Sequence, residues 1–121
     1  MASLTTFDQY ASEVRAGKLE WSPPHLSEQF WKANAGKLTE DNQELIKILT
    51  TIISTSQDPK VLAIAAHDIG QYVKYAATGK KVVQELGAKT KVMELMAHDD
   101  LDVRYQALMA VQKFMANAWE A

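Results

Sequence analysis

The sequence contains no cysteine, so disulfide scaffolds and zinc sites built on thiolates are excluded. It contains no apolar run near the roughly 20 residues that a helix needs to cross a bilayer. Residues 1–10 lack the positively charged start and the apolar core of a signal peptide. We therefore expect a cytoplasmic protein, or a cytoplasmic piece of one, with no direct membrane insertion.

A set of side chains suited to catalysis or metal binding is also missing. The three histidines, His25, His67 and His98, include no pair spaced four residues apart and no His-Glu-x-x-His motif. A base and its orienting acid could be His67 and Asp68, but neighbouring helical residues point in different directions. A structural hydrogen bond from Asp68 to another helix is favoured, and His98 is expected in a solvated loop. We expect no catalytic, cofactor-binding or metal-binding residues.

An excess of positive charge is absent as well, because the formal net charge is −2. Five lysines could still form a basic patch near one edge: Lys74, Lys80, Lys81, Lys89 and Lys91. The aromatic side chains that alternate with basic ones in nucleic-acid sites are missing here. A solvated face, or a site for an acidic protein partner, is therefore favoured, and no nucleic-acid partner is expected.

The sequence does contain helical periodicity with an internal repeat. Residues 58–73 align with residues 100–115, so that Val61 falls on Val103. Their separation lies within the roughly 40–47 residues typical of armadillo and HEAT repeats. No stretch alternates polar and apolar residues for long enough to predict a strand. The sequence therefore predicts an all-α, armadillo/HEAT-like right-handed helical repeat solenoid, with about two repeats plus N-terminal helices.

Caps and glycines divide the chain into helices, with Ser3 or Thr6 expected as the first N-cap and Gly17 as the first stop. The expected helices cover residues 3–16, 25–35, 39–53, 59–73, 80–86, 89–97 and 101–117. The last helix is expected to bury Leu108. Residues 1–36 hold the N-terminal helices and a Trp-Ser-Pro-Pro linker, and residues 37–121 the armadillo/HEAT-like repeats, in one compact domain. Because solenoids usually need at least three repeats, we expect a fragment of a longer chain.

The three tryptophans, Trp21, Trp31 and Trp119, lie outside the repeats. One interpretation is that they pack the end segments. The other is that they anchor an interface, where tryptophan often carries much of the binding energy. The sequence weighs the two equally.

Three motifs stand out along the chain. They are Leu19-Glu20-Trp21-Ser22-Pro23-Pro24-His25, followed by Phe30-Trp31 and Asn34; Ala65-Ala66-His67-Asp68-Ile69-Gly70; and Val103-Arg104-Tyr105-Gln106-Ala107-Leu108, leading to Ala110-Val111-Gln112-Lys113. Together they resemble the C-terminal domain of the H subunit of the vacuolar-type proton-pumping ATPase (V-ATPase). The resemblance covers about Leu4 to Glu120, and the Trp-Ser-Pro stretch is its most specific part.

This resemblance implies a non-catalytic regulatory subunit, which activates the assembled pump and inhibits ATP hydrolysis by the detached peripheral sector. The implied partners are other pump subunits: the catalytic head, the peripheral stalk and the cytosolic domain of the membrane sector. The implied location is the cytosolic face of vacuolar or endosomal membranes. In this family a loop before the small-residue helix is implicated in contacting the catalytic head, and the matching residues are Ser56, Gln57, Asp58 and Lys60.

The alternative is a generic armadillo-type adaptor that binds peptide segments of other proteins. Such adaptors line a groove with regularly placed tryptophan and asparagine on their long inner helices. The long helices here carry Tyr72 and Asn117 and show no such ladder, so the regulatory subunit is favoured. An enzyme is disfavoured, because no acid, base or metal-binding set converges.

Overall fold

The computed structural model describes residues 5–116, and every regular element in that range is helical. The elements are α1 (Thr6–Ala16), α2 (Pro23–Leu26), α3 (Glu28–Asn34), the 3-10 helix η1 (Ala35–Thr39), α4 (Glu40–Thr55), α5 (Pro59–Tyr75), α6 (Gly79–Glu85), α7 (Ala88–Leu95) and α8 (Leu101–Met115). The all-α class is therefore confirmed over the described range. None of the helices in that range is long and apolar enough to cross a membrane.

The ends of α1 are fixed by its capping residues. Thr5 is the N-cap, so the expectation of Ser3 or Thr6 is wrong. The Thr5 hydroxyl accepts a hydrogen bond from Asp8 N–H at 3.0 Å, and the Asp8 carboxylate accepts one from Thr5 N–H at 3.2 Å. This reciprocal pair satisfies two backbone donors at the start of the helix. Gly17 ends the helix with φ of +69°, as predicted.

The single helix expected over residues 25–35 is divided in the structure into α2, α3 and the start of η1. The two prolines begin α2 early, at positions where a missing N–H costs little. Ser27 then adopts an extended conformation, and its hydroxyl accepts a hydrogen bond from Phe30 N–H at 3.1 Å. This second N-cap starts a new helix in a new direction, which a periodicity argument does not detect.

The start of α4 also differs from the expected start at Thr39. Asp41, Asn42 and Gln43 have φ of +53°, +59° and +63°, so the regular right-handed helix begins after Gln43. Aspartate and asparagine tolerate the left-handed region better than most residues. Beyond this point the apolar period holds, and the residues of α4 that are buried are Leu45, Ile46, Leu49, Ile52 and Ile53.

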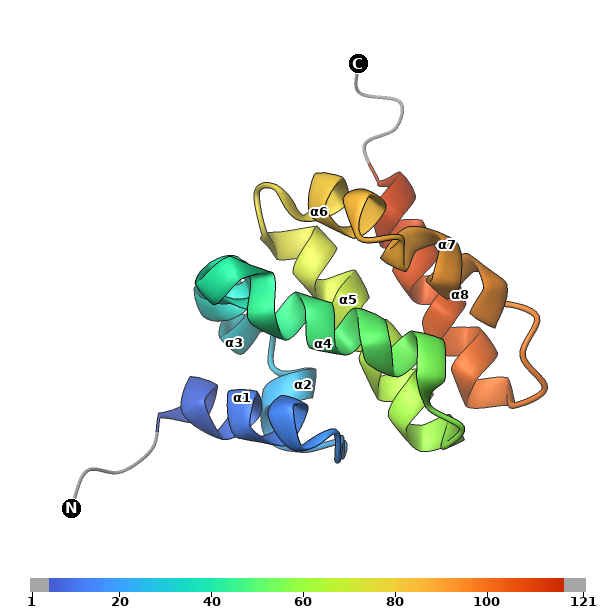
Figure 1. The fold of residues 1–121 in the computed structure, drawn as a ribbon, viewed down its shortest axis with the longest axis horizontal. Coiled ribbons are helices and arrows are strands. Elements are labelled where there is room, and N and C mark those ends of the chain that lie inside the picture. The colour runs from blue at the N-terminus through green and yellow to red at the C-terminus, as the bar shows by residue number, and fades with distance from the viewer. Residues whose placement is uncertain (1–4, 117–121) are drawn as a thin grey trace.

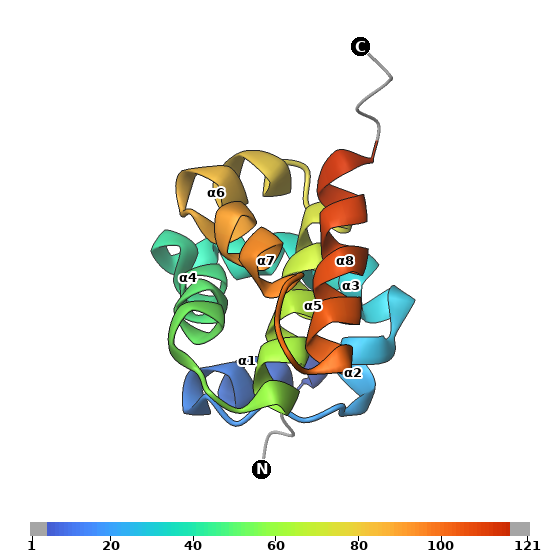
Figure 2. The same cartoon turned by 90° about the vertical axis from the view of Figure 1, so that its right-hand side faces the viewer.

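The two copies of the repeat form α5 and α8, which lie side by side in both Figure 1 and Figure 2. Gly70 in α5 permits their close approach. A Cβ built on Gly70 would lie 3.0 Å from the Cα of Ala110 in α8. Because the contact involves backbone on α8, a larger residue at position 70 could be accommodated only by moving a helix.

One buried cluster extends from Tyr10 in α1 to Phe114 in α8. The division into residues 1–36 and 37–121 stays a prediction, and so does the armadillo/HEAT-like right-handed solenoid. On α8 the buried positions are Val103, Ala107, Ala110 and Phe114. Leu108 is 46% exposed, so the prediction that it is buried is wrong. It lies on the face of α8 opposite to the core.

Candidate functional site

The predicted contact loop joins α4 to α5 and is shaped by two side-chain caps. The Ser56 hydroxyl accepts a hydrogen bond from Asp58 N–H at 3.2 Å. Asp58 is the N-cap of α5, and its carboxylate accepts one from Lys60 N–H at 2.9 Å. Ser56 is half-buried, whereas Gln57, Asp58 and Lys60 are exposed. The four predicted residues therefore lie together, on one short structured loop and the first turn of α5.

Lys60 connects this loop to the Trp-Ser-Pro-Pro linker. Its ammonium donates to both carboxylate oxygens of Glu20, at 2.7 and 2.8 Å. The hydrogen bond to Glu20 raises the pKa of Lys60 above its ordinary value. Both side chains are largely exposed, so the pair orients the loop more than it stabilises the fold.

The linker is held in turn by Glu13 of α1. One carboxylate oxygen of Glu13 accepts from Glu20 N–H at 2.8 Å and faces Nε2 of His25 at 2.8 Å. The other oxygen accepts from the Ser22 hydroxyl at 2.9 Å. Because one carboxylate binds three separate groups, the linker has a defined path without regular backbone pairing.

His25 lies between two carboxylates and is fully buried. Its Nδ1 is 2.6 Å from Oδ2 of Asp68, and its Nε2 faces Glu13. Burial by itself would lower the pKa of His25. The hydrogen bonds and negative charges of Asp68 and Glu13 outweigh burial and raise that pKa above its ordinary value. The favoured form is therefore the protonated imidazole, which donates from both ring nitrogens.

Three side chains converge on Asp68 of α5. Its Oδ2 accepts from the Tyr10 hydroxyl at 3.0 Å and faces His25, and its Oδ1 lies 2.9 Å from Nδ1 of His67. The predicted hydrogen bond from Asp68 to another helix is thus confirmed. The argument that His67 and Asp68 point apart is wrong, because the imidazole turns back toward its neighbour. Burial and the charge of Asp68 raise the pKa of Tyr10, which keeps its hydroxyl a donor.

One tryptophan fits the packing interpretation, and the interface interpretation stays a prediction. Trp31 is fully buried, and its Nε1–H donates to the carbonyl of His25 at 2.9 Å, so it packs the end segment. Trp21 is 37% exposed and its ring centroid lies 5.1 Å from that of His67. Its remaining surface is available for contact beside the linker. Trp119 lies outside the described residues.

We call Tyr10, Glu13, His25 and Asp68 the buried clamp, since they join α1, the linker and α5. The clamp has acidic and basic groups, but Tyr10, His25 and Asp68 are fully buried, which denies a substrate access. Over residues 5–116, no group of three or more His, Asp or Glu side chains is arranged to hold a metal ion. The clamp can therefore fix the relative positions of its segments, and its burial keeps a substrate from contacting its acidic and basic groups.

His98 lies in the loop before α8, as expected, but its side chain is not fully solvated. It is half-buried, and its Nδ1 accepts a hydrogen bond from Asp100 N–H at 3.0 Å. Asp100 in turn caps α8, accepting from Val103 N–H at 3.0 Å. The imidazole thus supports a helix start, which is a structural role.

Sequence reasoning missed Glu13, Glu20 and His25 as residues that build the site. A signal for His25 exists, because it ends the linker motif, while Asp68 is a charge within the mostly apolar middle of α5. A buried charge needs a partner, which could have linked the two motifs. Glu13 carries no such signal, since helices commonly expose glutamates.

Nearly the whole chain is similar to one family. The model of the V-ATPase H-subunit family matches residues 3–119. The V-type proton ATPase H subunit of Drosophila melanogaster is 50% identical over 117 residues, which cover 97% of this chain and 25% of that protein. The probable V-type proton ATPase H subunit of Oryza sativa subsp. japonica is 38% identical over 118 residues, covering 98% and 26%. The chain spans about a quarter of the length of these relatives. It belongs to the V-ATPase H-subunit family.

Proposed function

We propose that the chain is a non-catalytic regulatory part of a vacuolar proton-pumping ATPase. In this role it activates the assembled pump and inhibits ATP hydrolysis by the detached peripheral sector. The observation that carries the proposal is the buried clamp, in which His25 of the linker motif meets Asp68 of the small-residue motif. Two of the three family motifs therefore serve one purpose, which is to hold a rigid body with an exposed loop at residues 56–60.

The proposed partners are the catalytic head, the peripheral stalk and the cytosolic domain of the membrane sector. The proposed location is the cytosolic face of vacuolar or endosomal membranes. The proposed architecture is an armadillo/HEAT-like right-handed solenoid, with N-terminal helices in residues 1–36 and repeats in residues 37–121. Relatives named as H subunits of the V-type proton ATPase support the pump as the assembly.

Rigidity is what an inhibitor of a rotary machine needs. Such a protein slows the machine when it binds a halted arrangement of stationary and rotating parts better than the others. A load on loop 56–60 passes directly into α5, because Asp58 caps that helix. The clamp passes it on to α1 and the linker. Because the loop cannot move independently of the helices, the energy of its contact restrains the partner and is not lost in deforming the loop.

The exposed groups of the loop are polar and of both signs. They are the amide of Gln57, the carboxylate of Asp58 and the ammonium of Lys60. Polar contacts of this kind govern specificity and association rate more than total affinity. Glu20 restrains Lys60 before binding, which reduces the ordering cost of a contact there.

The test is ATP hydrolysis by a purified, detached peripheral sector from which the H subunit has been removed, with the chain titrated in. We expect dose-dependent inhibition by the wild-type chain. The combined variant Gln57→Ala, Asp58→Asn, Lys60→Ala removes the contacts but keeps a residue that can cap α5. Its inhibition constant is expected to rise about tenfold, which corresponds to about 1.4 kcal/mol of lost contact energy.

A matched control changes Lys91 and Glu94 to alanine, since these exposed residues pair with each other on α7, away from the loop. This control should inhibit like the wild type. A folded wild-type chain that binds the sector without slowing hydrolysis contradicts the inhibitory role. Equal inhibition by the loop variant and the control contradicts the assignment of the contact to loop 56–60 and leaves the inhibitory role intact.

A further inference from the structure

The outer face of α8 carries an apolar stripe that the described elements leave exposed. Its members, at spacings of three, four and seven residues, are Leu101, Tyr105, Leu108 and Met115, with exposed fractions of 71%, 58%, 46% and 55%. At about 100° per residue these positions share one side of the helix. Figure 2 shows α8 at the front of the molecule with α5 behind it. A surface helix normally turns a polar face outward, so a second apolar face indicates a contact surface.

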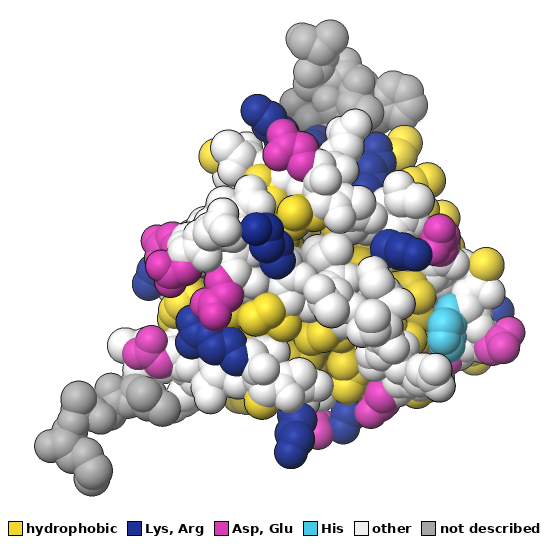
Figure 3. All heavy atoms as spheres, viewed as in Figure 1, with side chains coloured by type: hydrophobic (Ala, Val, Ile, Leu, Met, Phe, Trp, Pro, Cys, Tyr) yellow, Lys and Arg dark blue, Asp and Glu magenta, His cyan; other side chains and the backbone are white. Residues whose placement is uncertain are grey.

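A hollow of about 390 Å³ borders the stripe, between α5, α6 and α8. Lysines from all three helices line it: Lys74, Lys80 and Lys113. Apolar atoms of Val73 and Met109 line it as well, and none of the described lining residues is acidic. In Figure 3 hydrophobic (yellow) and basic (dark blue) side chains lie along the upper right, where Figure 1 shows the C-terminal end of α8.

Positive charge converges in this hollow, and no acidic residue is among those described as lining it. Among the pairs formed by residues 5–116, no ion pair includes Lys74, Lys80 or Lys113. Lys113 is half-buried, and burial together with the charge of Lys74 lowers the pKa of Lys113. Lys80 donates a hydrogen bond to the carbonyl of Ala116. A carboxylate that enters the hollow would relieve this repulsion, and the partly apolar lining would strengthen its attraction.

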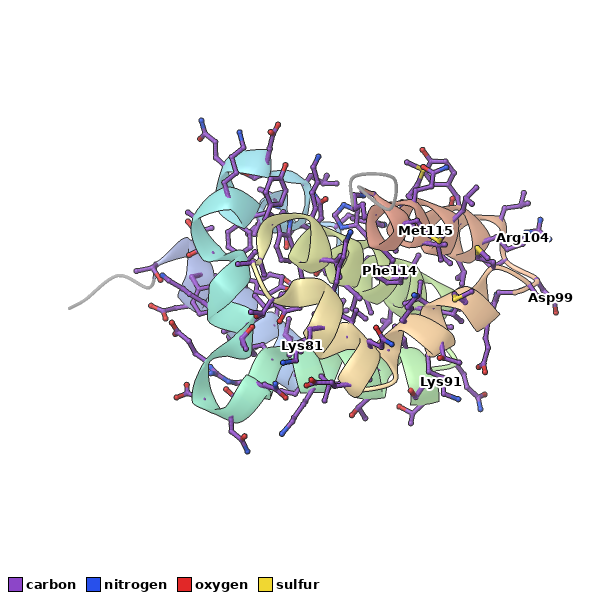
Figure 4. All side chains as sticks on the ribbon, turned by 90° about the horizontal axis from the view of Figure 1, so that it is seen from above. Lys81, Lys91, Asp99, Arg104, Phe114 and Met115 are labelled. Atoms are coloured by element: carbon purple, nitrogen blue, oxygen red, sulfur yellow. The ribbon has the colours of Figure 1, made fainter. Side chains whose placement is uncertain are left out.

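The other end of α8 is acidic. Asp99, Asp100 and Asp102 surround its first turn, and Figure 4 shows Asp99 and Arg104 at the opposite end of the helix from Met115. A nucleic acid or an anionic membrane lying along α8 would be repelled by these aspartates. A free phosphate would leave the apolar stripe uncovered. A protein segment can instead be apolar along its length and acidic at one end.

We propose that the outer face of α8 and the adjoining lysine hollow form a docking surface for an acidic amphipathic helix of another protein. The apolar side chains of that helix cover the stripe, and carboxylates at one end enter the hollow. The hollow lies near the C-terminal end of α5, whereas loop 56–60 lies at its N-terminal end. The proposal therefore goes beyond the inhibitory contact and does not depend on it.

The probe is a fluorescein-labelled helical peptide with leucine at every third or fourth position and glutamates grouped at one end. Its control has the same composition, with the leucines scattered around the helix. The chain is titrated with each peptide by fluorescence anisotropy and by amide chemical shifts. We expect saturable binding of the first peptide only, with shifts confined to the outer face of α8 and the hollow.

Two charge-matched variants separate the hollow from general charge. K74Q/K80Q/K113Q should bind the peptide at least about tenfold more weakly with an unchanged melting temperature. K47Q/K81Q/K91Q should bind like the wild type, because these lysines are exposed elsewhere; Figure 4 shows Lys81 and Lys91 on α6 and α7. A further variant, L108S, should weaken binding by interrupting the stripe.

Three results would overturn the proposal. The first is no saturation by the wild-type chain up to millimolar peptide, or equal weakening by both lysine variants. The second is preferential binding to vesicles containing phosphatidylserine, which would assign the surface to a membrane. The third is a dimer in light scattering whose contact shifts the same α8 resonances without peptide, which would assign it to a second copy of the chain.

Discussion

Replacing His25 with alanine removes the central group of the buried clamp. The change takes away the imidazole between Glu13 and Asp68, and Asp68 is fully buried. Removing one partner of a buried ion pair typically costs about 3–5 kcal/mol, because the remaining charge loses its counter-charge. The space left by the ring adds to this cost. We expect the free energy of unfolding to fall by about 4 kcal/mol, a large share of the roughly 5–15 kcal/mol typical of a domain.

The stabilisation of the fold by His25 is expected to decrease as pH rises. The folded-state pKa of His25 is raised above its unfolded value of about 6.5. The stabilisation from the protonated ring is therefore fully present below about pH 6.5, and it is lost as pH rises through the higher folded pKa. The difference in unfolding free energy between wild type and His25→Ala should shrink in that window, by at most about 1.4 kcal/mol per pH unit.

The assay is urea unfolding of both proteins between pH 5.5 and 8.5, followed by tryptophan fluorescence and circular dichroism. His98→Ala serves as the control, since that imidazole accepts one hydrogen bond in a half-buried loop. Its cost should be about 1 kcal/mol. A loss below about 1 kcal/mol for His25→Ala, or a difference that grows as pH rises, would refute the charged clamp.

Three further changes probe other parts of the fold. Gly70→Ala should cost about 1–3 kcal/mol in urea unfolding, because its Cβ would lie 3.0 Å from the Cα of Ala110; an unchanged midpoint would show that α5 and α8 can separate freely. Asp58→Ala should lower stability by about 1 kcal/mol through loss of the α5 N-cap, whereas Asp58→Asn should nearly preserve it in thermal melts. Trp31→Phe leaves the buried carbonyl of His25 without its donor and should cost about 1–3 kcal/mol, as checked by calorimetry.

Local chemistry made several helix ends predictable. Gly17 ends α1, Asp58 caps α5 and Asp100 caps α8, because each acts on backbone groups within a few residues. The errors arose where two local signals compete. Ser27 offers a second cap inside a periodic run, and Thr5 outcompetes its neighbours because Asp8 completes a capping box.

The place of the candidate site was predictable in part. The polar stretch before the small-residue helix forms a loop, as its composition predicts, whereas its contact role is implied only by the family resemblance and stays a prediction. The clamp was not predictable, because His25 and Asp68 lie 43 positions apart and helical periodicity carries no information over that range. A buried and unpaired Asp68 would cost free energy, so the sequence indicates that Asp68 needs a partner. It does not identify that partner.

The missing side chain at Gly70 also affects the surface. A Cβ there would lie 3.3 Å from Cδ of Lys113, so the glycine leaves room for the lysine stem to lie against α5. Positions 70, 110 and 113 therefore share one limited volume. A larger residue at 70 meets the Ala110 backbone, which only a shift of α8 can relieve, and the Lys113 stem, which a shorter side chain at 113 can relieve. A substitution at the core position 70 would thereby favour replacement of the charged residue at 113 on the surface.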